Sequence, residues 1–97
     1  MIKKLEKMPF ANARVEISED GKRIYLWSYK TVVAHIINNW LIVNGLYSMT
    51  TRKHISAFMK EYYNSDYATA KDCYENGYML NIETGEIRFL KDVFDNN

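Results

Sequence analysis

Two basic residues and a histidine follow a pair of threonines near the predicted start of a helix. Arg52, Lys53 and His54 come directly after Thr50 and Thr51. The first amides of a helix lack partners within the helix and its dipole makes that end positive, so cations are an unusual choice there. Hydroxyls, free N–H groups and cations together predict a partner-binding site for an anion, either a phosphate of nucleic acid or a carboxylate of a protein. The alternative is that these side chains extend into solvent or pair with nearby acidic residues.

Two aromatic residues form a second candidate site, on a predicted strand over residues 23–28. Successive side chains of a strand point to opposite faces, so Tyr25 and Trp27 share one face while Ile24 and Leu26 share the other. If helices cover the aliphatic face, the aromatic face stays open and can stack on bases or anchor a protein interface. A strongly curved sheet with both faces covered is the alternative.

The other reactive side chains form no catalytic or metal-binding pattern. His35 lies between two apolar residues of a predicted strand, where we expect a structural role, and Cys73 has no second cysteine to pair with. The spacings typical of zinc sites, calcium loops and phosphate-binding loops are missing. We therefore expect a protein without enzymatic activity, with no catalytic residues, no cofactor and no metal ion.

The hydrophobic pattern predicts the elements that position these residues. Alternating polar and apolar residues with turn residues between them predict an antiparallel four-stranded β-meander over residues 13–45. The pattern then changes to that of two helices over residues 50–76, followed by a β-hairpin over residues 78–90. Residues 1–12 are interpreted as a basic arm or short helix, and residues 91–97 as a frayed acidic tail. The expected fold class is α+β, and the apolar face of the first helix comprises Ile55, Phe58, Met59 and Tyr62.

Size and composition predict a single domain over residues 1–97. Of the 97 residues 47% are hydrophobic, which is enough for one small core. The formal net charge of +1 gives the whole molecule little attraction for nucleic acid. The single cysteine indicates a reducing compartment, and the N-terminal lysines are not followed by the apolar segment of a signal peptide. We expect a cytoplasmic protein that does not contact membranes.

Two motifs resemble a family of small uncharacterised proteins of phages, prophages and plasmids, a domain of unknown function. Ser28-Tyr29-Lys30-Thr31-Val32-Val33-Ala34 is similar to its strand motif Ser-Tyr-x-Thr-x-Val-Ala. Tyr47-Ser48-Met49-Thr50-Thr51-Arg52-Lys53-His54 is similar to its helix-start motif Tyr-Ser-x-Thr-Thr-x-x-His. The resemblance covers about residues 24–62 and implies a mobile-element origin but no activity. The motif at residues 47–54 is either a binding site or a structural helix cap.

These observations predict a binding protein of the phage type, which covers a functional surface of a host protein. An inhibitor of a host defence complex, of the anti-CRISPR kind, is one concrete form. Aromatic anchors on the open sheet face would hold the target, with acidic turns complementing a basic surface. The alternative is a small nucleic-acid-binding accessory or regulatory protein that uses Arg52, Lys53 and His54 with the N-terminal lysines. An unpaired edge strand leaves both a monomer and a homodimer open.

Overall fold

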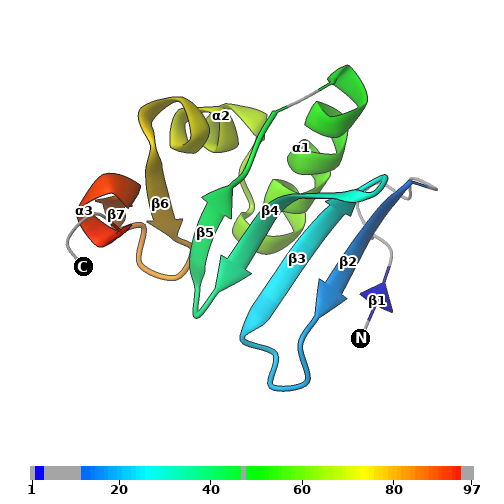
Figure 1. The fold of residues 1–97 in the computed structure, drawn as a ribbon, viewed down its shortest axis with the longest axis horizontal. Helices are drawn as coiled ribbons and strands as arrows, with labels where there is room; N and C mark the ends of the chain where they lie inside the picture. The colour runs from blue at the N-terminus through cyan, green and yellow to red at the C-terminus, as the bar shows by residue number, and fades with distance from the viewer. Residues whose placement is uncertain (1, 4–11, 47, 95–97) are drawn as a thin grey trace.

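The computed structural model describes residues 2–3, 12–46 and 48–94, which form seven strands and three helices. The strands are β1 (Ile2–Lys3), β2 (Ala13–Ile17), β3 (Arg23–Ser28), β4 (Thr31–Ile37), β5 (Trp40–Val43), β6 (Tyr78–Asn81) and β7 (Ile87–Phe89). The helices are α1 (Met49–Tyr63), α2 (Tyr67–Asn76) and α3 (Leu90–Phe94). The strands lie side by side in the order β1 to β7, each antiparallel to the next, with α1 and α2 behind them in Figure 1. This confirms the predicted α+β class.

Tight turns connect the four predicted strands, which are β2 to β5. Gly21 and the pair Asn38 and Asn39 have positive φ values of 73°, 50° and 73°. Glycine and asparagine tolerate this left-handed region, and two such residues in succession match the right-handed twist of a hairpin. Tyr29 also has a positive φ, of 57°, in the turn between β3 and β4. The meander over residues 13–45 is therefore confirmed.

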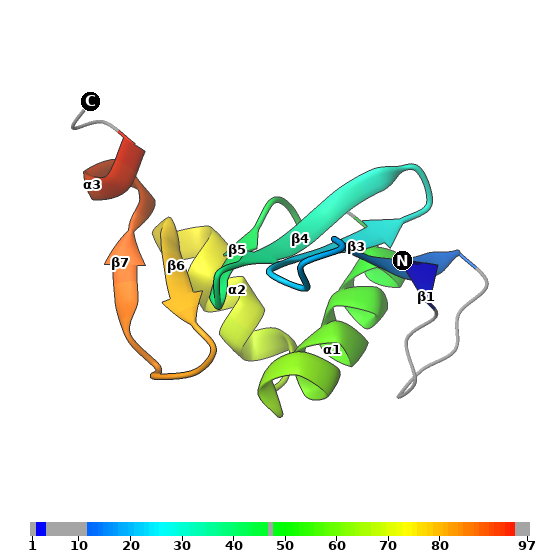
Figure 2. The same ribbon diagram turned by 90° about the horizontal axis from the view of Figure 1, so that it is seen from below.

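Both long helices cover the same face of the sheet, as Figure 2 shows from below. Helix α1 packs on β3 and β4, while α2 packs on β5 and β6. The buried side chains between the layers include Leu26, Leu41 and Val15 from the sheet and Phe58 and Ile55 from α1. The face of β3 that carries Leu26 is thus the covered one, and among the described residues α1 and α2 leave the opposite face of the sheet open.

Capping residues fix both ends of the two long helices. The Ser48 side chain accepts a hydrogen bond from the Thr51 amide at the start of α1, and Asp66 caps α2 in the same way through Thr69. Asn64 and Gly77 end the helices in the left-handed conformation. These caps confirm the two helices predicted over residues 50–76.

The two ends of the chain differ from their predictions. Ile2–Lys3 is an edge strand paired with β2, where a basic arm or short helix was predicted, and residues 4–11 lie outside the described part. The predicted frayed tail begins as helix α3, with residues 95–97 outside the described part. The C-terminal hairpin is confirmed, and β6 joins it to β5, so all strands form a single sheet.

None of the helices in the described part of the chain is both long enough and apolar enough to cross a lipid bilayer.

Candidate functional site

The open face of the sheet carries the aromatic residues that the sequence singled out. Tyr25 and Trp27 lie on it, both partly exposed, because the helices cover the Leu26 face. Strand register sets their neighbours: Glu16 and His35 flank Tyr25, while Arg14 and Val32 flank Trp27. A third row of residues that lie opposite one another begins at Arg23 of β3 and continues across β4 and β5 to Asn81 of β6. We call this surface the open face, and it comprises Arg14, Glu16, Arg23, Tyr25, Trp27, Val32, His35, Ile37, Trp40, Ile42 and Asn81.

Arginines lie over both tryptophan rings of this surface. The Arg14 guanidinium is 4.7 Å from the centre of the Trp27 ring, whose indole N–H donates a 3.0 Å hydrogen bond to Glu16. Arg88 of β7 lies 4.8 Å from the centre of the Trp40 ring. Each pair is a cation–π contact that holds the ring and the arginine in a fixed orientation. The open face therefore presents preorganised aromatic and cationic groups at two places.

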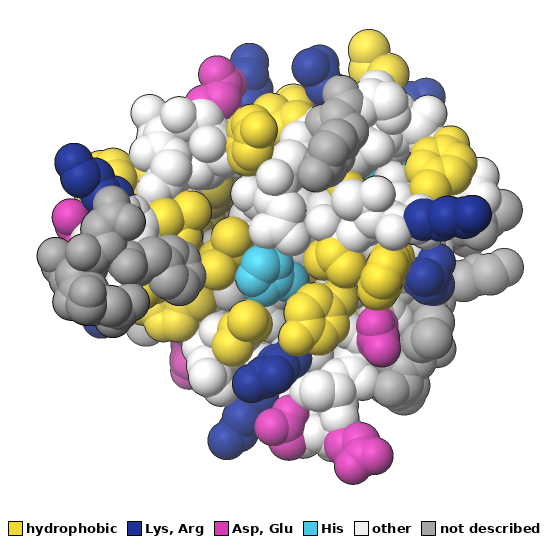
Figure 3. Space-filling model, viewed as in Figure 1, with side chains coloured by type: hydrophobic (Ala, Val, Ile, Leu, Met, Phe, Trp, Pro, Cys, Tyr) yellow, Lys and Arg dark blue, Asp and Glu magenta, His cyan; other side chains and the backbone are white. Residues whose placement is uncertain are grey.

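His35 occupies the middle of the open face. Its ring centre lies 6.0 Å from that of Tyr25, and its Nδ1 atom is 3.2 Å from the side-chain nitrogen Nδ2 of Asn44. Removal of solvent around it lowers the pKa of the imidazole, so the neutral form is favoured near neutral pH. Figure 3 shows hydrophobic side chains gathered around a histidine on this face. His35 is thus part of a surface, where the sequence predicted only a structural role.

The predicted anion site at the start of α1 is not assembled in the structure. Thr51 and His54 point into the core, whereas Arg52 and Lys53 are exposed and Thr50 is partly exposed. The Thr51 amide already donates to Ser48. The guanidinium of Arg52 lies 5.6 Å from the centre of the Tyr67 ring. The five residues therefore do not converge on one point, because the helical period sends neighbours to opposite sides.

The buried part of this motif forms a polar cluster with the end of β3. The hydroxyl of Ser28 is 2.8 Å from Nδ1 of His54 and 3.2 Å from the hydroxyl of Thr51, which is 3.3 Å from that of Ser48. The ring of Tyr29 lies 6.0 Å from that of His54. Burial lowers the pKa of His54, so the neutral imidazole is favoured.

A serine beside a histidine also has the geometry of a nucleophile and its base. Such a pair acts on a substrate only if the substrate reaches the hydroxyl. Only 3% of Ser28 and 1% of His54 is exposed. In this conformation the contact serves to satisfy buried polar groups between β3 and α1.

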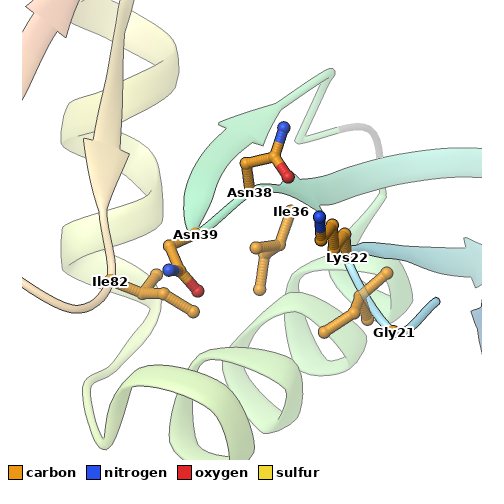
Figure 4. A pocket seen from close by; sticks show the side chains of 7 residues that line it. Gly21, Lys22, Ile36, Asn38, Asn39 and Ile82 are labelled. Carbon is orange, nitrogen blue, oxygen red and sulfur yellow. The ribbon is translucent and has the colours of Figure 1, made fainter.

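A small pocket of about 230 Å³ opens where two turns meet at one end of the sheet (Figure 4). Sites for small-molecule ligands usually measure roughly 300–1,000 Å³, so this pocket fits no more than a small group. The side-chain amide of Asn39 on its rim already donates a 2.9 Å hydrogen bond to the Glu83 carboxylate. The lining residues are Gly21, Lys22, Ile24, Ile36, Asn38, Asn39 and Ile82.

The remaining candidate, Cys73, is buried in α2, and burial raises the pKa of its thiol to about 11. A thiol in that state is a poor nucleophile and a poor metal ligand. Within residues 12–46 and 48–94, no three side chains of His, Cys, Asp or Glu gather where they could hold a metal ion.

The sequence did not single out Arg14 and Trp40 of the open face, or Arg88, whose guanidinium lies over the Trp40 ring. The alternation of Arg14 with buried Val15 could have placed Arg14 opposite the core. Placing Trp40 beside Ile37 needs the two-residue Asn38–Asn39 turn, because the turn sets the register. The position of Arg88 depends on the pairing of β5 with β6, which no local pattern shows.

A family model described as "Family of unknown function (DUF8033)" matches residues 2–76. The matched segment runs from β1 to the end of α2 and holds every residue of the open face except Asn81. Searches of curated proteins and of solved structures found no match to the chain.

Proposed function

We propose that this chain, which belongs to that family of unknown function, is a non-enzymatic protein that binds a partner protein through its open face. The observation that carries the proposal is the pairing of Arg14 with Trp27 and of Arg88 with Trp40 around Tyr25. Trp, Tyr and Arg are the residues that contribute most of the binding energy at protein interfaces. A sheet face that keeps these side chains partly exposed, with none of the helices of the described residues over it, supports a docking surface.

The charges on the open face favour a protein over a phosphate backbone. Arg14 and Arg23 are accompanied by Glu16, whose carboxylate is held in the face by the Trp27 indole. A fixed carboxylate repels phosphates, whereas a protein surface can present a donor to it and carboxylates to the arginines. The acidic residues Glu19 and Asp20 lie in the exposed turn beyond the ends of β2 and β3, at the rim of this surface.

The resemblance to phage and plasmid proteins suggests the concrete form of this proposal. The partner is a host protein in the cytoplasm, and binding blocks one of its functional surfaces by steric exclusion. An inhibitor of a defence complex, such as a CRISPR effector, belongs to this class. A rigid sheet supports such a role because little conformational entropy is lost on binding.

The test compares capture of partners by wild type and two variants. Tyr25→Lys places a charge in the middle of the open face, while Lys53→Ala changes an exposed residue of α1, on the helical layer. We expect wild type and Lys53→Ala to capture the same protein from a host lysate, and Tyr25→Lys to capture at least about tenfold less. Circular dichroism confirms that all three are folded. Equal capture by all three proteins, or capture of nothing, contradicts the proposal.

Nucleic-acid binding is the second candidate, because arginines beside aromatic rings also form stacking surfaces for single strands. Because the residues at the start of α1 do not converge, we propose that this candidate uses the open face and not Arg52 and Lys53. Fluorescence anisotropy with single- and double-stranded probes, over a series of salt concentrations, tests it. Binding that weakens steeply with salt and survives Arg52→Ala with Lys53→Ala supports this candidate. No binding at low salt rejects it.

A further inference from the structure

Strand β7 ends the sheet with a hydrophobic edge. Its three residues Ile87, Arg88 and Phe89 are all exposed, Ile87 at 49% and Phe89 at 51%. Figure 2 shows β7 as the outermost strand on the side away from β1, with α3 following it. Exposed edge strands usually carry charged side chains or are covered by a helix or loop, because their unpaired backbone groups pair readily with another chain. An edge with two half-exposed hydrophobic side chains is therefore a candidate interface.

The hydrogen bonds to β6 show which backbone groups of β7 face outward. The Asn81 amide donates to the Glu86 carbonyl at 2.8 Å, and the Leu90 amide donates to the Gly77 carbonyl at 2.9 Å. Glu86 and Leu90 therefore face β6. Because the backbone groups of successive residues in a strand point to alternate sides, the N–H and C=O groups of Ile87 and Phe89 face away from β6, at the outer edge of the sheet as the described residues form it.

The sequence of this edge is complementary to itself. In a symmetric antiparallel pair centred on Ile87, each Ile87 lies opposite its copy and can exchange both hydrogen bonds with it. The same register places Glu86 of each chain opposite Arg88 of the other chain, so the dimer contains two such pairs. Within one chain these two side chains already form an ion pair at 3.1 Å, so they lie on the same face. The alternative register, centred on Arg88, places two arginines directly opposite each other, which is destabilising.

We infer that the chain forms a symmetric homodimer in which β7 pairs with β7 of a second copy, centred on Ile87. The pairing covers the exposed Ile87 and Phe89 side chains and gives the outward backbone groups of Ile87 a partner. It adds Glu86–Arg88 contacts between the chains. This inference is argued from the edge of β7 and does not depend on the proposed function, although Arg88 of β7 also lies over the Trp40 ring of the open face.

Charge reversals test the interface through sedimentation velocity over a range of protein concentrations. We expect wild type to be a monomer–dimer mixture. In Glu86→Arg both positions 86 and 88 are positive, and in Arg88→Glu both are negative. Like charges then face each other across the dimer, so each variant alone is expected to dimerise at least about tenfold more weakly than wild type. An equimolar mixture of the two single variants restores the dimer, because the opposite charges then face each other between chains. The double variant Glu86→Arg with Arg88→Glu restores it as well.

A backbone variant provides an independent check. Ile87→Pro removes only the outward N–H, which makes no hydrogen bond to β6, and the circular dichroism spectrum reports whether the sheet remains. We expect a folded monomer. A wild type that stays monomeric at all concentrations, single reversals that dimerise as wild type does, or a mixture that fails to associate would each overturn the inference.

Discussion

The hydroxyl of Ser28, the last residue of β3, lies 2.8 Å from Nδ1 of His54, 26 residues later in α1. With Thr51 at 3.2 Å, this contact joins the strand to the first turns of the helix that covers it. Both motifs singled out in the sequence contribute to it, Ser28 from the first and Thr51 and His54 from the second. Tyr47 of the second motif lies outside the described residues, and the arrangement of residues 48–54 supports their interpretation as a structural cap in which Ser48 begins the helix.

Replacing Ser28 by alanine is expected to destabilise the fold. The change removes the buried hydroxyl that contacts the His54 Nδ1 atom and the Thr51 hydroxyl, and the loss of one partner of a buried hydrogen bond costs about 1–3 kcal/mol. Urea unfolding followed by circular dichroism measures the loss. Thr50→Ala is the matched control, because Thr50 is partly exposed in the same turn, and we expect a change below about 0.5 kcal/mol. A Ser28→Ala protein as stable as wild type would show that the cluster does not stabilise the fold.

Acidification below the ordinary histidine pKa is expected to lower stability. Burial holds the pKa of His54 below its usual 6.5, and the pKa of His35 shifts in the same direction. Between the folded pKa and 6.5, the unfolded chain binds more protons than the folded one. The free energy of unfolding therefore falls as the pH is lowered through this range, and the full contribution is present above about pH 6.5.

Two measurements check this dependence. Urea unfolding at a series of pH values gives its direction. NMR titration of the imidazole signals gives the pKa of each histidine in the folded wild type, so no destabilised variant is needed. A folded-state pKa of His54 above 6.5 would contradict the burial argument, whatever the overall acid sensitivity.

Local patterns predicted most of the fold. Alternation around Leu26 identified β3 and its two faces, and the apolar face from Ile55 to Tyr62 identified α1. The change from one pattern to the other also fixed the order of strands and helices. Such patterns show which side of a strand or helix is apolar. Because the apolar sides of the sheet and of the helices must pack together, this is enough to predict a two-layer arrangement.

The composition of the open face was harder to predict, because it depends on contacts between distant strands. His35 was expected to have a structural role because it lies between Ala34 and Ile36, yet its side chain is on the opposite face of the strand from these two buried neighbours. At the start of α1, helical geometry turns His54 inward, although its basic neighbours suggested a surface role. Charge and residue type alone do not give the direction of a side chain; the position of the covering layer decides it.

The turn at Asn38 is expected to tolerate glycine but not a β-branched residue. Asn38 has a φ of 50°, where a side chain branched at Cβ clashes with the backbone at a cost of about 1–2 kcal/mol. Thermal unfolding should show Asn38→Gly within about 0.5 kcal/mol of wild type and Asn38→Val destabilised by about 1–2 kcal/mol. Equal stability of the two variants would mean that the left-handed turn is not required for the β4–β5 hairpin.

The thiol of Cys73 is expected to be protected from disulfide reagents in the folded protein. Burial, together with the neighbouring Asp72, raises its pKa from 9.0 to about 11, which lowers the thiolate fraction near pH 8 about 100-fold. The side chain lies in the core between α2 and the sheet, so the reagent must also wait for an opening of the structure. Labelling by a chromogenic disulfide should therefore be at least about 100-fold slower in buffer than in denaturant, and Cys73→Ser provides the unlabelled control. A rate in buffer close to that in denaturant would show that α2 detaches from the sheet readily, and the two-layer core would then need to be reconsidered on the side of β5 and β6.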